Sequence, residues 1–213
     1  MARKTESEDR PPGEGFSRRS FLQGSALATA GATVMGVAAV LIDQSAAAPS
    51  GLLIEGPGYV SIKLQVNGAT RTLQVEPRMT LAEALRGPLS LTGTKIACDR
   101  GACSACTVWL DGMTVSSCML LAIDVGTRSV TTIEGMAKGP QLHPVQAAFI
   151  EHDAMQCGFC TPGMVMSCAA LLQHTPRPTA TDVQAAISGH ICRCGTYPHV
   201  IAATLAAAKT YKA

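Results

Sequence analysis

Residues 98–106 read CDRGACSAC, and a further cysteine follows within the next predicted hairpin. The four cysteines of this motif are Cys98, Cys103, Cys106 and Cys118. Their spacing, C-x4-C-x2-C with one distant cysteine, is typical of proteins that bind a [2Fe–2S] cluster. Three thiolates in one irregular loop let the backbone wrap the cluster, and Gly101 suits that loop because glycine turns freely at positive φ. A zinc site fits less well, since tetrahedral sites favour paired C-x2-C knuckles.

Short strands are predicted on both sides of this cysteine loop. Apolar and polar residues alternate over 59–66, as in a half-buried strand, and Asn67-Gly68 is a strong hairpin signal. Further strands are expected over 71–75, 107–110, 113–117 and 130–133. Thr80 and Glu83 have the spacing of a capping box, which predicts a short helix. We expect this half of the chain to be a small mixed α/β sheet.

The pattern changes to helices after residues 136–142, which we interpret as a linker. Proline opens three of the predicted helices, where its missing N–H has no partner to lose. These helices are expected to start at His143-Pro144, Thr161-Pro162 and Tyr197-Pro198, with a further one capped by Thr179 and ending at Gly189. Four short helices predict an all-α second half.

A second set of cysteines lies in the helical half. It comprises Cys157, Cys160, Cys192 and Cys194, with the spacing C-x2-C followed by a distant C-x-C. Taken alone, this spacing leaves zinc or disulfide bonds open. The first pair, however, stands at the start of the helix opened by Pro162, where the helix dipole stabilises thiolates. Two pairs from two loops at helix ends could hold one [2Fe–2S] cluster. Cys168, Met155, Met164 and Met166 are expected to be core residues.

Composition and charge exclude several other classes of protein. Apolar residues make up 47% of the chain and charged residues 15%, which argues against a largely disordered chain. The formal net charge is +2 and no basic stripe stands out, so nucleic acid is a poor candidate partner. The sequence shows no nucleophile–base pair, glycine-rich phosphate loop or HExxH helix. We therefore assign no catalytic residue and interpret the chain as a carrier of electrons.

The N-terminal segment has the composition of a targeting peptide. Residues 17–22 read SRRSFL, an uncharged run extends over 26–42, and the alanines at 46–48 are of the small type that signal peptidases cut. The paired Arg18 and Arg19 resemble a twin-arginine export signal. This predicts a periplasmic protein that is exported already folded, with its cofactors loaded in the cytosol. A basic, apolar anchor that stays attached is the alternative.

Two stretches of the helical half carry a recognisable pattern, QCGFCTPG at residues 156–163 and CRCG at residues 192–195. Preceded by the first cysteine motif, they resemble the iron–sulfur small subunit of the molybdenum hydroxylases, the family of xanthine dehydrogenase and aldehyde oxidoreductase. The resemblance extends over about residues 58–210. The leader narrows it to the exported, separately encoded small subunits of periplasmic aldehyde oxidoreductases and similar dehydrogenases.

The resemblance implies a fold class and a division into domains. The fold is expected to be α+β, with a plant-type [2Fe–2S] ferredoxin-like (β-grasp) domain followed by an all-α four-helix [2Fe–2S] domain. The expected segments are 1–48 as a twin-arginine signal peptide, 58–135 as the ferredoxin-like domain, 136–142 as the linker and 143–210 as the helical domain.

The resemblance also implies a function within a larger complex. A large subunit would hold the molybdopterin cofactor and oxidise the substrate, here expected to be an aldehyde. This chain would pass the electrons through two [2Fe–2S] clusters to a FAD subunit or a cytochrome. Gln156 and Cys194 resemble the family positions that hydrogen-bond the pterin. A free-standing ferredoxin and a disulfide-stapled exported binding protein are the alternatives.

Two residues depart from the pattern of this family. Ser104 stands where glycine is usual between the second and third ligands of the first motif, and His190 stands where asparagine is common. If position 104 requires a positive φ, serine costs about 1 kcal/mol there. Neither departure removes a ligand, so the resemblance implies that both clusters still bind.

Overall fold

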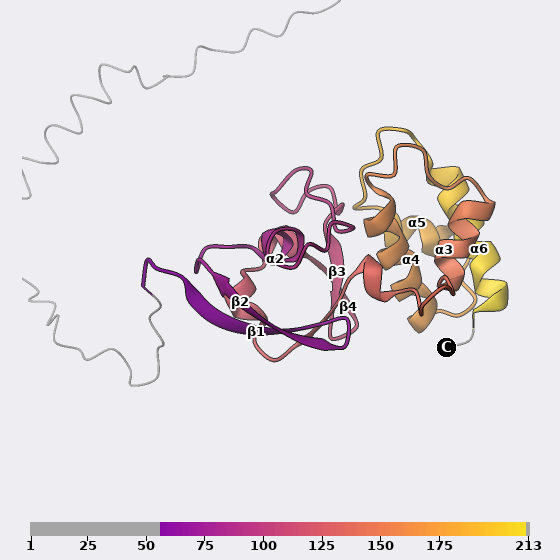
Figure 1. Ribbon diagram of the computed structural model, residues 1–213. Coiled ribbons are helices and arrows are strands. Elements are labelled where there is room, and N and C mark those ends of the chain that lie inside the picture. The colour runs from indigo at the N-terminus through magenta and orange to yellow at the C-terminus, as the bar shows by residue number, and fades with distance from the viewer. Residues whose placement is uncertain (1–55, 212–213) are drawn as a thin grey trace, which may run out of the picture. The chain divides into compact units, whose positions relative to one another are not determined.

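The computed structural model describes residues 56–211 (Figure 1). The expected signal peptide, with Arg18, Arg19 and its cleavage site, lies outside the described residues. Within them, one five-stranded sheet with the helix α2 (Leu81–Arg86) is followed by four α-helices. This arrangement confirms the predicted α+β fold class.

The strands pair in the order β2-β1-β5-β3-β4. Their bounds are Val60–Val66 (β1), Ala69–Val75 (β2), Thr107–Leu110 (β3), Met113–Ser116 (β4) and Ser129–Thr131 (β5). β1 runs antiparallel to β2 and parallel to β5, whereas β3 is antiparallel to both β4 and β5. The turn at Asn67-Gly68 has φ of 51° and 78°, the positive values that a tight hairpin requires. The hairpin prediction is therefore confirmed.

The last strand differs from its prediction. β5 ends at Thr131, whereas the sequence pattern predicts a strand that continues to Ile133. The cause is the side chain of Asn67, whose Oδ1 accepts a hydrogen bond from the backbone N–H of Thr132 at 2.9 Å. Because this side chain takes the place of a ladder partner, the strand stops and the 3-10 helix η3 (Ile133–Gly135) begins.

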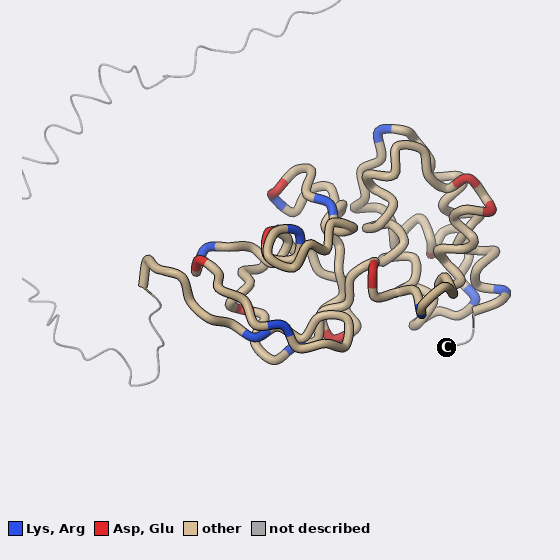
Figure 2. The backbone as a smooth tube through the Cα atoms, viewed as in Figure 1, with Lys and Arg blue, Asp and Glu red and all other residues tan. Residues whose placement is uncertain are grey.

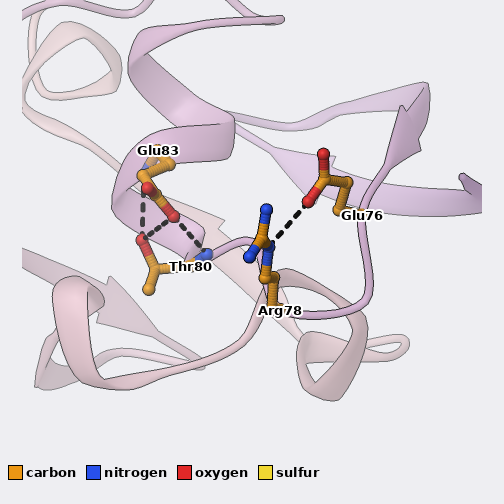
Figure 3. Close-up of polar contacts among 4 residues, drawn as sticks. All are labelled: Glu76, Arg78, Thr80 and Glu83. Carbon is orange, nitrogen blue, oxygen red and sulfur yellow. Dashed lines mark hydrogen bonds and ion pairs between the residues drawn. The ribbon is translucent and has the colours of Figure 1, made fainter. Parts of the chain in front are cut away.

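The capping box predicted at the start of α2 is present (Figure 3). The backbone N–H of Thr80 donates to Glu83 Oε2 at 2.8 Å, and the N–H of Glu83 donates to Thr80 Oγ1 at 3.3 Å. The nearby ion pair between Arg78 and Glu76 is exposed and contributes little to stability. The helix buries its apolar side against the sheet in a core that includes Leu64, Val66, Leu73, Val75, Leu81, Leu85, Val108, Leu110 and Val130.

The helical half begins after Gln141. Its helices are α3 (Pro144–Glu151), α4 (Thr161–His174), α5 (Ala180–Ile187) and α6 (Tyr197–Thr210). α4 is the central element, since it packs against α3, α5 and α6 and also against β3. Figure 1 shows these helices, orange to yellow, gathered in the C-terminal half of the described chain.

One buried contact joins the sheet to the helices. Trp109 of β3 belongs to the apolar core of the helical half, and its Nε1–H donates to the backbone oxygen of Met166 in α4 at 2.9 Å. An indole N–H in a buried place needs such a partner, so this contact determines how the strand meets the helix. Among residues 56–211, no helix has the length and apolar character needed to cross a membrane.

Candidate iron–sulfur sites

The first cysteine motif folds into the loop between α2 and β3 together with the short 3-10 helix η1 (Ser117–Met119). The structure brings together here the side chains of Cys98, Cys103, Cys106 and Cys118. Two loop N–H groups point at sulfur, that of Ala102 at 3.3 Å from Cys98 Sγ and that of Gly101 at 3.3 Å from Cys118 Sγ. Gly101 has a φ of +70°, as the predicted loop requires.

The four thiols of this loop interact as two pairs, Cys98 with Cys103 and Cys106 with Cys118. The pKa of Cys98 is lowered to about 7, chiefly by the backbone N–H of Arg100 and then by the neighbouring thiol of Cys103. Burial raises the pKa of Cys118 to about 11, and the thiol of Cys106 adds to the increase. A diiron cluster needs two thiolates for each iron, which is the arrangement that these two pairs provide.

Ser104 lies in this loop with a φ of 56°, so the position does require the left-handed conformation. Serine costs about 1 kcal/mol there relative to glycine. Two hydrogen bonds hold the turn, because the backbone N–H and the hydroxyl of Thr107 both donate to the carbonyl oxygen of Ser104, at 3.2 and 2.7 Å.

The second set of cysteines comes from two loops. One loop leads into α4, and the other connects α5 to α6. Cys160 is the N-cap residue of α4, and Cys192 and Cys194 precede α6. The pKa of the exposed Cys157 is lowered by the backbone N–H of Phe159 and then by the thiol of Cys194. In the folded chain, the thiol of Cys157 therefore interacts with that of Cys194.

The remaining two cysteines form the buried pair of this set. Burial raises the pKa of Cys160 to about 12, and the nearby Cys192 adds to the increase. For Cys192 itself burial acts in the same direction, but the hydroxyl and the backbone N–H of Thr196 outweigh it and lower the pKa to about 7. Both cysteine sets thus show the same pattern of two thiol pairs.

The donor sets fit a diiron cluster. Within residues 56–211, no three side chains of His, Cys, Asp or Glu gather closely enough to hold one ion. Every cysteine in this range, including Cys168, is a free thiol. Four sulfurs that interact as two pairs match the two irons of a [2Fe–2S] cluster. The residues present therefore fit two [2Fe–2S] clusters.

The two cysteine loops contact each other directly. The backbone N–H of Ile191, next to Cys192, donates to the carbonyl oxygen of Cys103 at 3.2 Å. Gly163, in the first turn of α4, has no room for a side chain because an added Cβ would overlap the carbonyl oxygen of Ser104. The sequence pattern does not predict this contact between the two cysteine loops. Its one sequence signal is Gly163, a glycine in the first turn of a predicted helix.

His190, which departs from the family pattern, is buried at the same junction. One ring nitrogen, Nε2, lies 2.8 Å from the Ser167 hydroxyl of α4. Burial lowers the pKa of this imidazole to about 4, so it is neutral at physiological pH. The side chain therefore ties the second cysteine loop to α4 without adding a charge beside the sulfurs.

An exposed apolar surface surrounds the first residues of the second motif. Phe159 and Met155 are 46% and 39% exposed, so the prediction that Met155 is a core residue is wrong, whereas Met164 and Met166 are fully buried. Met155 lies in the loop between α3 and α4, outside the helical periodicity that buries the other two. Gln156 beside it is also exposed.

Figure 2 shows charges of both signs scattered along the described chain, with no run of one sign.

Sequence reasoning missed two residues that shape the second loop. The hydroxyl of Tyr197 accepts a hydrogen bond from the backbone N–H of Cys192 at 2.8 Å and donates to the carbonyl oxygen of His190 at 3.0 Å. Thr196 contacts the sulfur of Cys192. Their only sequence signal is that two hydrogen-bonding side chains follow directly after the C-x-C pair.

Two family models match the chain. A 2Fe-2S iron-sulfur cluster binding domain matches residues 64–128, and a [2Fe-2S] binding domain matches residues 132–205. Together they cover both cysteine sets.

Curated relatives are similar over most of their length. The chain is 38% identical over 203 residues to the aldehyde oxidoreductase iron-sulfur-binding subunit PaoA of Escherichia coli K12, covering 88% of this chain and 86% of the relative. It is 46% identical over 146 residues to the nicotine 6-hydroxylase small subunit of Paenarthrobacter nicotinovorans, covering 68% and 88%.

Solved structures of oxidoreductases are similar to this chain in fold and in sequence. Quinoline 2-oxidoreductase from Pseudomonas putida 86 superposes with a TM-score of 0.69 at 41% identity, over 71% of this chain and 95% of that chain. The aldehyde oxidoreductase from Desulfovibrio gigas gives a TM-score of 0.67 at 36% identity, over 71% of this chain but 17% of that much longer chain.

Proposed function

This chain belongs to the iron–sulfur subunits of the molybdenum hydroxylases, and from that membership we propose that it serves a complex that oxidises aldehydes. The chain is the electron-transfer subunit of a molybdenum-cofactor complex and not a free-standing ferredoxin. The large subunit of such a complex holds the molybdopterin, and the chain itself binds two [2Fe–2S] clusters. Aldehyde as the substrate class is supported by the PaoA relatives, which match along nearly the whole chain.

The eight paired cysteines are the proposed ligands. In the first site, Cys98 and Cys103 would hold one iron and Cys106 and Cys118 the other. In the second site, the corresponding pairs are Cys157 with Cys194 and Cys160 with Cys192. When bound, each cluster takes up and releases one electron at a time. The N–H groups that already point at sulfur would stabilise the more negative, reduced form.

The observation that carries this proposal is the direct contact between the two cysteine loops. The hydrogen bond from Ile191 to Cys103 joins a residue next to one ligand set with a member of the other. It keeps the two sites at a fixed separation, which electron transfer between them needs. The exposed surface around Met155 and Phe159 supports docking of the large subunit at the second site.

Gln156 and Cys194 are the proposed contacts to the pterin on that face. Gln156 is exposed, so its amide is free to bond a partner molecule, and Cys194 lies half-buried beside the exposed Cys157. The second site would therefore be first in the order of electron flow and the ferredoxin-like site second. A FAD subunit or a cytochrome is the proposed acceptor beyond it.

The test uses the complete complex, purified anaerobically with its large subunit. Adding an aldehyde is expected to reduce both clusters and produce two distinct [2Fe–2S] signals in electron paramagnetic resonance. An N-heterocycle such as nicotinate serves as the competing substrate. Reduction by the heterocycle and not by the aldehyde would contradict the proposed substrate class, and purification of the chain without any large subunit would contradict its place in a complex.

Export through the twin-arginine route is the proposed localisation, supported by Arg18-Arg19 before Phe21-Leu22 and an uncharged run. Replacing both arginines by lysine is expected to leave most of the protein in the cytoplasm, because the route reads the arginine pair itself. Immunoblots of periplasmic and cytoplasmic fractions measure the change. Arg10→Lys, outside the motif, is the matched control and should export normally; equal export of the double variant would refute the proposal.

A further inference from the structure

Thr196 stands directly before α6 at the position where a helix is capped. Its carbonyl oxygen accepts the first helical hydrogen bond, from the N–H of Val200 at 3.0 Å. Threonine in this place usually turns its side-chain oxygen toward the N–H groups of the first turn. Here the side chain makes no such bond, although the residue is only 2% exposed. Its hydroxyl is therefore committed elsewhere.

The partner of that hydroxyl is a proposed cluster ligand. Thr196 Oγ1 lies 3.4 Å from Cys192 Sγ. A cysteine sulfur that binds iron has lost its proton. The direction of the bond is then determined, because only the threonine hydroxyl has a hydrogen to donate. A buried threonine hydroxyl thus donates to this sulfur.

The surrounding loop holds this geometry in place. Tyr197 accepts a hydrogen bond from the N–H of Cys192 and donates to the carbonyl oxygen of His190, so it ties the backbone just before the sulfur to the start of α6. Threonine is branched at Cβ and has few side-chain rotamers, which limits its hydroxyl to a small range of directions. The donor is thus held in a fixed direction toward the sulfur.

We propose that Thr196 is a positioning residue for redox tuning, whose hydroxyl raises the reduction potential of the helical cluster by donating to Cys192 Sγ. The proposal rests on the proposed role of Cys192 as a ligand. Reduction adds a negative charge that the ligand sulfurs share, and a donor aimed at a sulfur stabilises that form more than the oxidised one. Among the described residues, Thr196 makes no hydrogen bond to a cysteine of the ferredoxin-like site, so we expect only the helical cluster to change.

A set of substitutions separates the hydroxyl from the shape of the side chain. Thr196→Val keeps the branched shape and removes the donor, whereas Thr196→Ser keeps the donor and removes a methyl group. The holo complex is titrated anaerobically, and both clusters are followed by their paramagnetic resonance signals. At the wild-type midpoint, Thr196→Val is expected to raise the oxidised-to-reduced ratio of the helical cluster about tenfold, since hydrogen bonds to charged groups are strong. That ratio corresponds to a potential lower by about 59 mV for one electron.

The ferredoxin-like cluster is the internal reference and should keep its midpoint in every variant. Thr196→Ser should stay close to wild type. A helical midpoint that is the same in Thr196→Val as in wild type, with full iron content, would overturn the inference and leave the proposed function intact. Iron missing from the helical site of the wild-type protein would instead overturn the ligand assignment itself.

If the Thr196→Val variant does not assemble its helical cluster, a second pair of variants tests the influence of the hydroxyl on the potential. Thr196→Ala and Thr196→Ser both lack the methyl group and differ in the hydroxyl alone. The inference expects the serine variant to have the higher midpoint, again by about a tenfold ratio. Equal midpoints in these two variants would show that the hydroxyl has no influence on the potential.

Discussion

Cys157→Ala is expected to remove one of the two clusters and leave the other in place. Iron should fall from roughly four to roughly two atoms per chain, because each [2Fe–2S] cluster carries two irons and alanine offers no thiolate. The paramagnetic signal of the ferredoxin-like cluster should remain. Cys157 is exposed, so the substitution disturbs no packed core.

The matched control for this prediction is Cys168→Ala. The Cys168 side chain is 0% exposed in α4, and burial raises its pKa to about 11, so it stays a thiol. Removing this sulfur leaves a small cavity and lowers the free energy of unfolding by about 1 kcal/mol, but iron content should not change. Iron analysis and paramagnetic resonance on the purified complexes compare the two variants. Full iron in Cys157→Ala, or loss of iron in Cys168→Ala, would contradict the ligand assignment.

Gly163→Ala is expected to push the two cysteine loops apart. Alanine favours a helix over glycine by about 1 kcal/mol, which by itself would stabilise α4. The added Cβ, however, would overlap the backbone oxygen of Ser104, and backbone cannot rotate away. Forcing an atom into a packed contact costs about 1–3 kcal/mol, so the steric effect exceeds the gain in helix propensity. The contact from Ile191 to Cys103 should weaken with it.

Two measurements on the iron-loaded complex test this prediction. Thermal unfolding should begin at a lower temperature, and reduction of the second cluster after rapid mixing with substrate should be slower. Gly189→Ala is the control within the same junction, since its Cβ would meet only the Ser104 hydroxyl, at 3.2 Å, and a hydroxyl can rotate. If the two variants behave alike, the junction does not control communication between the sites.

The residues that could be predicted to matter are those with a short-range signal. Asn67-Gly68 specifies a hairpin through its own backbone preferences, and Thr80 with Glu83 caps a helix over one turn. The loop around the cysteines predicts a positive φ at Gly101, which the structure confirms, and Ser104, where the sequence leaves the sign of φ open, also adopts a positive value. Each of these features depends on neighbours only a few residues away.

Met155 and the end of β5 show where such reasoning fails. A methionine near a helix suggests a core residue, yet Met155 lies in the loop between α3 and α4 and is 39% exposed. β5 stops because of Asn67, which is 65 residues away along the chain. No local pattern contains that contact, so only the fold could reveal it.

The spacing of the cysteines and the strand and helix periods determined by themselves that this chain is α+β and carries two sulfur sets, because these signals act within one loop or one turn. The tertiary structure alone decided which sulfurs pair, that the loop of Cys103 meets Ile191, and that Thr196 turns its hydroxyl to Cys192 and leaves its own helix uncapped. The contact between the two cysteine loops accompanies the close approach of α4 and β3, where Trp109 packs in the helical core and donates to Met166. Packing sums many weak contacts between distant segments, so it follows from the assembled fold rather than from any one stretch of residues.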